Sequence, residues 1–128
     1  MQAPLTAATN ADLAALLAGT DTCADTIGAF AAKYRGQAIE FDGSVGAMNN
    51  HADYNTRYDI LVSYGDFSET KSYGGPSFQF RDVGVSDLHL VGSDSIGVGA
   101  NLHVVAKVGE FVENQCLFLL DPVSTTVR

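Results

Sequence analysis

Hydrophobic and polar residues alternate in two stretches near the middle of the chain, on either side of a polar loop. In residues 37–48 the apolar side chains recur at odd positions, and Glu40 and Asp42 fall between them. Residues 57–64 alternate in the same way, with their apolar and aromatic side chains at even positions. A period of two is typical of a strand that buries one face. The pattern therefore predicts two β-strands, joined by a polar loop (49–56) that is a candidate for ligand binding.

Three further strands are expected downstream, over residues 77–81, 101–111 and 115–120. The last two are separated only by residues 112–114, and so short a spacing favours a hairpin. Because proline has no N–H to donate, we expect regular pairing to end at Pro122. The glycine-rich segment before the fourth strand is expected to be a connection, with one helical turn near residues 86–90.

Two helices are expected before the strands. Asn10 is a good N-cap for a helix over residues 11–18, and residues 21–35 form a second helix that ends at Gly36. The apolar stripe of the second helix would point to the core and consists of Cys23, Ile27, Phe30, Ala31 and Tyr34. Residues 1–9 are expected to be a flexible lead-in.

Two glycines, Gly43 and Gly46, interrupt the first strand, at positions where a strand can bend or bulge. A bent strand of this kind is needed in a small closed barrel. We therefore expect an α+β, mainly β fold, with a small five-stranded antiparallel barrel preceded by one or two helices. A chain of 128 residues needs only one core, so residues 10–128 are expected to form a single domain.

The order of these elements resembles the OB-fold, the five-stranded barrel that binds oligonucleotides and oligosaccharides. Four segments also resemble DUF4839, a bacterial family of unknown function found in Gram-positive organisms, often in secreted or lipid-anchored proteins. They are residues 34–43, 56–61, 85–88 and 119–125. Most of these residues belong to the core and to turns, and no functional residue is carried over from the family. The resemblance implies an OB-like barrel in an exported protein, extracellular or in the cell envelope.

The composition is that of a folded protein, with 46% hydrophobic and 17% charged residues. The net charge is −8, and the seven basic residues are scattered along the chain. This charge counts against nucleic acids and anionic membranes as partners, because both bind clustered lysine and arginine. No apolar run approaches the roughly 18 residues of a membrane span. Residues 1–5 lack the features of a signal peptide, so an exported chain would carry its signal upstream of them.

The two cysteines, Cys23 and Cys116, are both expected to project toward the core from elements that pack together. In an oxidising compartment they would form a disulfide, which contributes about 4 to 5 kcal/mol to stability in the chain-entropy model. Two buried free thiols are the alternative, since free cysteine is often buried. No metal is expected, because neither cysteine has a second ligand nearby in sequence. No cofactor motif is recognisable either.

The candidate site is a surface, because ligands of OB-like barrels lie across the outer face of the second and third strands and the adjoining loops. This face would present Arg57, Asp59, Gln79 and Arg81 from the strands and His51, Asp53 and Tyr54 from the loop. It has no row of aromatic residues on which single-stranded bases would stack. We therefore favour a non-catalytic binding module, with a protein, a peptide or a glycan as its partner.

Two alternatives remain. A small secreted hydrolase would use Glu40, Asp42 and Asp53 together with His51, although no nucleophile motif such as G-x-S-x-G is present. Binding of single-stranded nucleic acid rests on analogy with the fold alone. The histidine of the fourth strand, His103, is expected to be an exposed or half-buried residue of the sheet.

Overall fold

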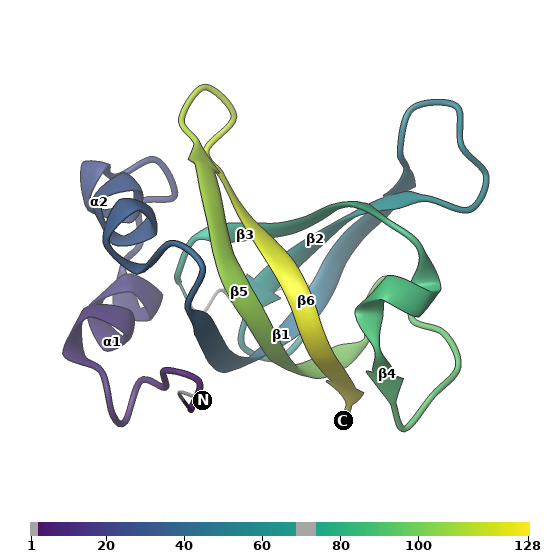
Figure 1. Ribbon diagram of the computed structural model, residues 1–128, viewed down its shortest axis with the longest axis horizontal. Coiled ribbons are helices and arrows are strands. Elements are labelled where there is room, and N and C mark those ends of the chain that lie inside the picture. Colours follow the sequence, from purple (N-terminus) through teal and green to yellow (C-terminus); the bar gives the residue numbers. More distant parts are fainter. Residues whose placement is uncertain (1–2, 69–73) are drawn as a thin grey trace.

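The structure, a computed structural model, describes residues 3–68 and 74–128. Two helices come first, α1 (Ala11–Ala18) and α2 (Asp25–Tyr34), and a β-barrel follows them (Figure 1). Its strands are β1 (Ala38–Asn50), β2 (Tyr58–Tyr64), β3 (Ser77–Val83), β4 (Leu90–Val91), β5 (Asn101–Val112) and β6 (Leu117–Val127). A 3-10 turn, η1 (Val85–Leu88), lies between β3 and β4, which confirms the expected helical turn.

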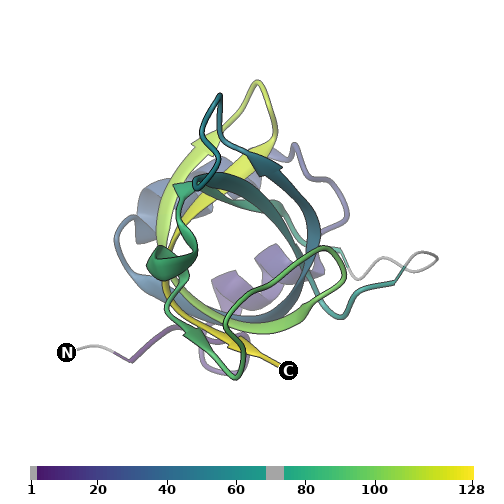
Figure 2. The same cartoon turned by 90° about the vertical axis from the view of Figure 1, so that its right-hand side faces the viewer.

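Five of these strands close into a barrel, which Figure 2 shows end-on as a ring. Neighbours follow the order β3-β2-β1-β5-β6, and β6 returns to pair with β3. The predicted OB-like barrel is confirmed, but the prediction of an entirely antiparallel sheet is wrong, because β3 and β6 are parallel. The reason is geometric: a closed ring with an odd number of strands cannot alternate direction throughout. The short strand β4, which the sequence pattern did not predict, also pairs in parallel with β6.

The core of the barrel contains three neighbouring phenylalanine rings. The ring centroids of Phe41 and Phe78 lie 4.7 Å apart, and those of Phe78 and Phe118 lie 5.3 Å apart. Helix α2 adds Phe30, which is buried with its ring 6.1 Å from Phe118, and α1 adds the fully buried Leu13. Figure 2 shows both helices behind the ring of strands. The helices therefore close one end of the barrel and share its core, where burial of apolar surface is the main stabilising term.

The two helices begin differently. The side chain of Asn10 accepts a hydrogen bond from the backbone of Leu13 at 2.9 Å, so the predicted cap of α1 is confirmed. Helix α2 begins at Asp25, and the predicted start at Asp21 is wrong. The carboxylate of Asp21 accepts from the backbone N–H of Cys23 at 2.9 Å and so stabilises a turn instead of a first helical residue.

The glycines of β1 mark its bend. The pairing of β1 with β2 shifts register between Val45 and Ala47, which places a bulge at Gly46 as the sequence predicts. At Gly43 the neighbouring strand comes so close that an added Cβ would lie 2.8 Å from the carbonyl oxygen of Ser63. Glycine is therefore required at this position for β1 and β2 to pair.

The last strand is longer than the pattern predicts. Regular pairing does not end at Pro122, because β6 continues to Val127 and pairs with β5 along this length. The register shifts where Ala106 faces Pro122 and Val105 faces Ser124, so Val123 is left over as a bulge. A bulge is one of the few places where a sheet tolerates a residue without an N–H.

Part of the expected lead-in lies against the barrel. The backbone N–H of Leu5 donates to the carbonyl of Ala38 at 2.9 Å, and the N–H of Glu40 donates to Leu5 at 2.8 Å. Leu5 therefore adds a short parallel bridge beside the start of β1.

Candidate functional site

The residues proposed for binding lie on β2, on β3 and in the loop between β1 and β2. We call the surface that they form the strand face; it consists of His51, Asp53, Tyr54, Arg57, Asp59, Gln79 and Arg81. The loop of the strand face lies at the end of the molecule opposite the helices (Figure 1). The seven residues therefore belong to one side of the barrel, and most of them are connected through side-chain hydrogen bonds.

His51 and Asp59 form the first part of the strand face. His51 Nδ1 lies 2.9 Å from Asp59 Oδ1, and the same oxygen accepts from the backbone N–H of Asp82 at 2.9 Å. The ring of Tyr54 is stacked on that of His51, with centroids 6.4 Å apart and an interplanar angle of 13°. Tyr54 is 58% exposed, so one flat aromatic surface faces solvent above a fixed histidine. Asp53 is exposed, and it is Asp59, not Asp53, that orients His51.

Arg57 forms the second part. Its Nε donates to Asp82 Oδ1 at 2.5 Å, and its Nη2 donates to the backbone carbonyl of Asp82. The same Nη2 lies 3.8 Å from Asp87 Oδ2. The hydrogen bond from Arg57 lowers the pKa of Asp82 below its usual value. Beside this pair lies a polar cleft of about 460 Å³, lined by residues 56–58 and 84–87. The guanidinium is therefore held in one orientation at the edge of an open cleft.

Arg81 forms the third part. It donates to Gln79 Oε1 at 2.7 Å along β3 and to Gln115 Oε1 at 2.8 Å in the turn between β5 and β6. The strand face therefore extends from the loop after β1 to the turn before β6. These are the two loops that border the ligand-binding surface in OB-folds.

A separate polar cluster lies on the outside of β1 and β5. His103 Nε2 lies 2.6 Å from Glu40 Oε2, and its Nδ1 lies 2.7 Å from Asp42 Oδ1. The hydrogen bonds to Asp42 and Glu40 raise the pKa of His103 above its usual value, against a smaller effect of burial. His103 was expected to be exposed or half-buried and is half-buried, but its position between these two carboxylates was not predicted. Because the imidazole lies between them, the carboxylates do not converge on a common point.

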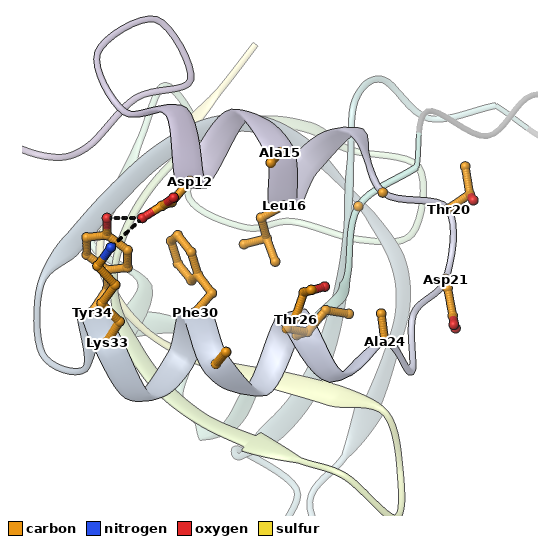
Figure 3. Close-up of a pocket in the computed structure, with 14 residues that line it drawn as sticks. Asp12, Ala15, Leu16, Thr20, Asp21, Ala24, Thr26, Phe30, Lys33 and Tyr34 are labelled. Atoms are coloured by element: carbon orange, nitrogen blue, oxygen red, sulfur yellow. Dashed lines mark hydrogen bonds and ion pairs between the residues drawn. The ribbon is translucent and has the colours of Figure 1, made fainter.

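The sequence analysis missed a cavity of about 600 Å³ between α1 and α2, which we call the helix cleft (Figure 3). Its walls are largely apolar and include Leu16 from α1 and Ile27 and Phe30 from α2. The helical periodicity assigns all three to a core, and they do contact it, but periodicity does not report how far apart two helices pack. No signal in the sequence therefore distinguished a cleft from a filled interface.

One end of the helix cleft is closed by polar side chains. Lys33 Nζ donates to Asp12 Oδ2 at 2.8 Å, and Tyr34 Oη donates to the same oxygen at 2.6 Å (Figure 3). The hydrogen bond from Lys33, followed by that from Tyr34, lowers the pKa of Asp12. Asp12 therefore joins the first turn of α1 to the last turn of α2.

The disulfide between Cys23 and Cys116 joins the turn before α2 to the turn between β5 and β6, with Cα atoms 5.0 Å apart. The pairing expected from the sequence is present, but the reason given for it is wrong. Cys23 is exposed and Cys116 half-buried, so neither projects into the core. Helix α2 begins after Cys23, and this residue is therefore not part of the apolar stripe.

The family model described as a domain of unknown function (DUF4839) matches residues 8–128. The chain belongs to this family. The match to DUF4839 includes both helices as well as the barrel, so the helix cleft and the strand face both lie within the family domain. No curated protein and no solved structure matches the chain.

Two further properties concern the described residues of this DUF4839 domain. Neither helix in residues 3–68 and 74–128 has the length and apolar character that crossing a membrane requires. Within the same residues, no group of three histidine, cysteine or acidic side chains has an arrangement that could hold a metal ion.

Proposed function

We propose that this DUF4839 domain is a non-catalytic binding module and that its strand face binds a neutral glycan. The observation that carries the proposal is the exposed ring of Tyr54, stacked on His51, whose own ring is hydrogen-bonded to Asp59. OB-like barrels use this surface and these loops for oligosaccharides and oligonucleotides. Of the two ligand classes, the net charge of −8 favours the uncharged one.

The chemistry of the strand face suits a sugar ring. A pyranose has apolar C–H faces, which pack on an aromatic ring, and hydroxyl groups at its edge that donate and accept hydrogen bonds. Tyr54 offers the ring, and the carboxylate of Asp59 and the guanidinium of Arg57 offer acceptors and donors. Because Asp59 and Arg57 are already oriented by their neighbours, little conformational freedom would be lost on binding.

Two arrangements support binding over hydrolysis. The pairing of His51 with Asp59 would orient a general base, but a hydrolase also needs a second acid or a nucleophile within reach of the same substrate atom. Glu40 and Asp42, the carboxylates proposed for that role, contact His103 on β5 instead of His51. Catalysis by these residues would require the cluster around His103 to open first.

Binding of single-stranded nucleic acid has less support. Bases stack on several aromatic rings that follow one another along a groove. Among the described residues, the aromatic side chains that are largely exposed are Tyr54 and Phe67, and only Tyr54 belongs to the strand face. The ring of Phe67 instead lies beside Gly99, in the segment that precedes β5.

A titration followed by amide NMR tests the proposal. Soluble neutral oligosaccharides, such as β-1,4-linked glucose and N-acetylglucosamine oligomers, are added to the labelled protein. We expect shifts confined to the loop 51–57, β2 and β3, and affinity reduced about tenfold by Tyr54→Ala. Val123→Ala is the matched control, because Val123 is also exposed but lies on β6.

Three results would contradict this proposal. Absence of shifts at the strand face with every oligosaccharide would remove the glycan as ligand. Appearance of cleaved sugar that Glu40→Gln or Asp59→Asn abolishes would support a hydrolase. Retention of a labelled single-stranded oligonucleotide at low salt, lost with Arg57→Ala or Arg81→Ala, would support nucleic-acid binding.

We also infer that the domain is exported, and the disulfide between Cys23 and Cys116 supports this location. Disulfides persist in oxidising compartments and are rare in the cytosol. The test is to block free thiols by alkylation in intact cells that produce the natural protein and then compare reduced and non-reduced samples. Alkylated cysteines in the non-reduced sample would show that the bridge is absent in the cell and would contradict export.

A further inference from the structure

We propose that the helix cleft is a second binding site, which takes a small amphiphilic amine with its ammonium group at Asp21 and its apolar body along Leu16 and Phe30. This site shares no residue with the strand face, whose loop lies at the other end of the molecule (Figure 1). The shape of the cleft, the different chemistry of its two ends and the rigidity of its rim support this assignment.

The volume and the walls of the cleft suit a small molecule with an apolar body. Ligand pockets typically have about 300 to 1,000 Å³ and are mostly apolar, with a few polar groups that fix orientation. The helix cleft has about 600 Å³. Figure 3 shows Leu16 reaching down from α1 and Phe30 reaching up from α2 between the two ends. An apolar chain lying there would be removed from water on two sides.

The carboxylates at the two ends of the cleft differ in whether a cation of the protein is already paired with them. At one end Asp12 already accepts hydrogen bonds from Lys33 and Tyr34, so its charge is compensated within the protein. At the other end lies Asp21, which no lysine or arginine of the described residues approaches within ion-pair distance. A ligand cation therefore finds its counter-charge at the Asp21 end.

The Asp21 end also offers a neutral hydrogen-bonding group. Thr20 precedes Asp21 in the turn that connects the helices, whereas Figure 3 shows Thr26 on α2 below Leu16, with Ala24 between it and Asp21. An ammonium group has three donors, of which the Asp21 carboxylate could accept one or two, and the others would remain available to water. The orientation follows: the head group lies at Asp21, and the apolar body extends toward the closed end at Tyr34.

The rim at this end is fixed to the barrel by two connections. Cys23 is bonded to Cys116, and the backbone N–H of Gly75 donates to the carbonyl of Gly19 at 2.7 Å. The carboxylate of Asp21 also accepts from the backbone of Cys23 at 2.9 Å, which orients it. A site whose rim is fixed before binding loses little entropy when the ligand enters.

A small ligand fits better than a folded partner. A stable protein interface buries about 800 Å² on each side. The helices that form the cleft have only 8 and 10 residues, and three residues of each are buried. A second protein would have to contact much more than the cleft, whereas an amine with a short apolar chain would be enclosed by it.

Three probes with the same decyl chain test the proposal: decylammonium, decanoate and decyl maltoside, each below the concentration at which it forms micelles. Calorimetry measures affinity, and amide NMR locates the site. We expect decylammonium to bind at least tenfold more tightly than the other two. Its shifts should be confined to α1, α2 and the turn that connects them.

Matched variants locate the head group and the chain. Asp21→Asn removes the charge, yet its side-chain oxygen still accepts from the backbone of Cys23, and we expect about tenfold weaker binding. Asp94→Asn makes the same change in net charge at an exposed residue outside the cleft and should have no effect. Ala15→Phe, at an exposed lining residue of α1, should fill the cleft and abolish binding of all three probes.

Several outcomes would overturn the proposal. Equal affinity for the three probes, or decylammonium binding unchanged by Asp21→Asn, would exclude recognition of the cation. Tighter binding of decanoate would assign the head group to Lys33 instead. Tighter binding of a basic apolar peptide than of decylammonium would replace the small ligand by a protein partner. Tyr54→Ala serves to separate the two sites, because it should weaken the glycan and leave the amine unaffected.

Discussion

The loop of the strand face and the helix cleft lie at opposite ends of one small domain (Figure 1), and the two sites hold their polar groups in different ways. On the strand face, His51 is held by Asp59 and Arg57 by Asp82, so each charge has a partner before any ligand arrives. In the helix cleft the charges are separated by an apolar wall, and Asp21 has no cationic partner among the described residues.

This difference indicates different kinds of ligand. A surface whose charges are already compensated recognises shape and hydroxyl groups, because a charged ligand would have to displace an internal partner. A cleft with apolar walls and, at one end, a carboxylate that no described cation pairs with recognises charge together with hydrophobicity. The structural elements that hold the two sites also differ. The strand face lies on paired strands, whereas the cleft depends on short helices, a helix cap and a disulfide.

Removal of the disulfide is expected to have the largest effect and to act mainly on the helix cleft. The bond joins residues 93 apart in sequence, and the double variant Cys23→Ser with Cys116→Ser should lower the free energy of unfolding by about 4 to 5 kcal/mol. Urea denaturation measures the loss. Hydrogen exchange should then show earlier opening of the segment 19–25 than of β2 and β3. Equal loss of protection in both regions would contradict the separate support proposed for them.

Substitution of Gly43 should act on the barrel beneath the strand face. In Gly43→Ala the new Cβ would meet the carbonyl oxygen of Ser63 at 2.8 Å, a backbone atom that cannot move without separating β1 from β2. We expect a loss of about 2 kcal/mol in the free energy of unfolding. Gly97→Ala is the control, because a Cβ there would meet no heavy atom within 4 Å. Equal stability of the two variants would show that β1 and β2 pair less closely than described.

Loss of the cap of α1 should have a smaller effect, limited to the helix cleft. Asn10→Ala removes the acceptor for the backbone N–H of Leu13 and should lower the free energy of unfolding by about 1 kcal/mol. Asn10→Asp retains the acceptor and should restore most of that stability. Affinity of decylammonium should fall in Asn10→Ala, whereas glycan affinity should not change. A loss at both sites would show that they are coupled through the core.

The smallest effect concerns pH and the cluster at His103, outside both regions. Because its pKa is raised in the folded state, protonation of His103 stabilises the fold; the contribution is complete below about pH 6.5, the unfolded value, and is lost as pH rises through the folded pKa. The side chain is 38% exposed, so the contribution should be less than about 1 kcal/mol. Urea midpoints of the natural protein and of His103→Gln, compared from pH 5 to 9, should converge at high pH. A difference between the two urea midpoints that does not change with pH would show that His103 stabilises the fold through packing instead of charge.

Local patterns in the sequence predicted most of the fold. Asn10 as a cap, the bulge at Gly46 and the alternation in β1 and β2 each depend on neighbours in sequence, and each is confirmed. The errors have two different causes, a contact distant in sequence at Pro122 and a local side-chain contact at Asp21. Pro122 is accommodated because β5 lies opposite its bulge, and Asp21 forms a turn because its side chain competes with the helix.

The candidate sites were predictable only in part. The alternation and the OB-like order of strands predict that the loop and the second strand contain His51, Tyr54 and Arg57. The pairing of His51 with Asp59 is a tertiary contact that alternation cannot show. The helix cleft was missed altogether, since its residues carry the same helical spacing as a filled core and only the distance between α1 and α2 makes a cavity.

The parallel pairing of β3 with β6 has a kinetic consequence. Residues 77–79 pair with residues 117–119, so the ring stays open until the residues of β6 have been synthesised. During that time β3 has an unsatisfied edge with the buried residues Phe78 and Phe80, the kind of edge that recruits strands from other molecules. Fragments that end before β6 should therefore aggregate instead of forming a smaller barrel, and light scattering during refolding would detect this.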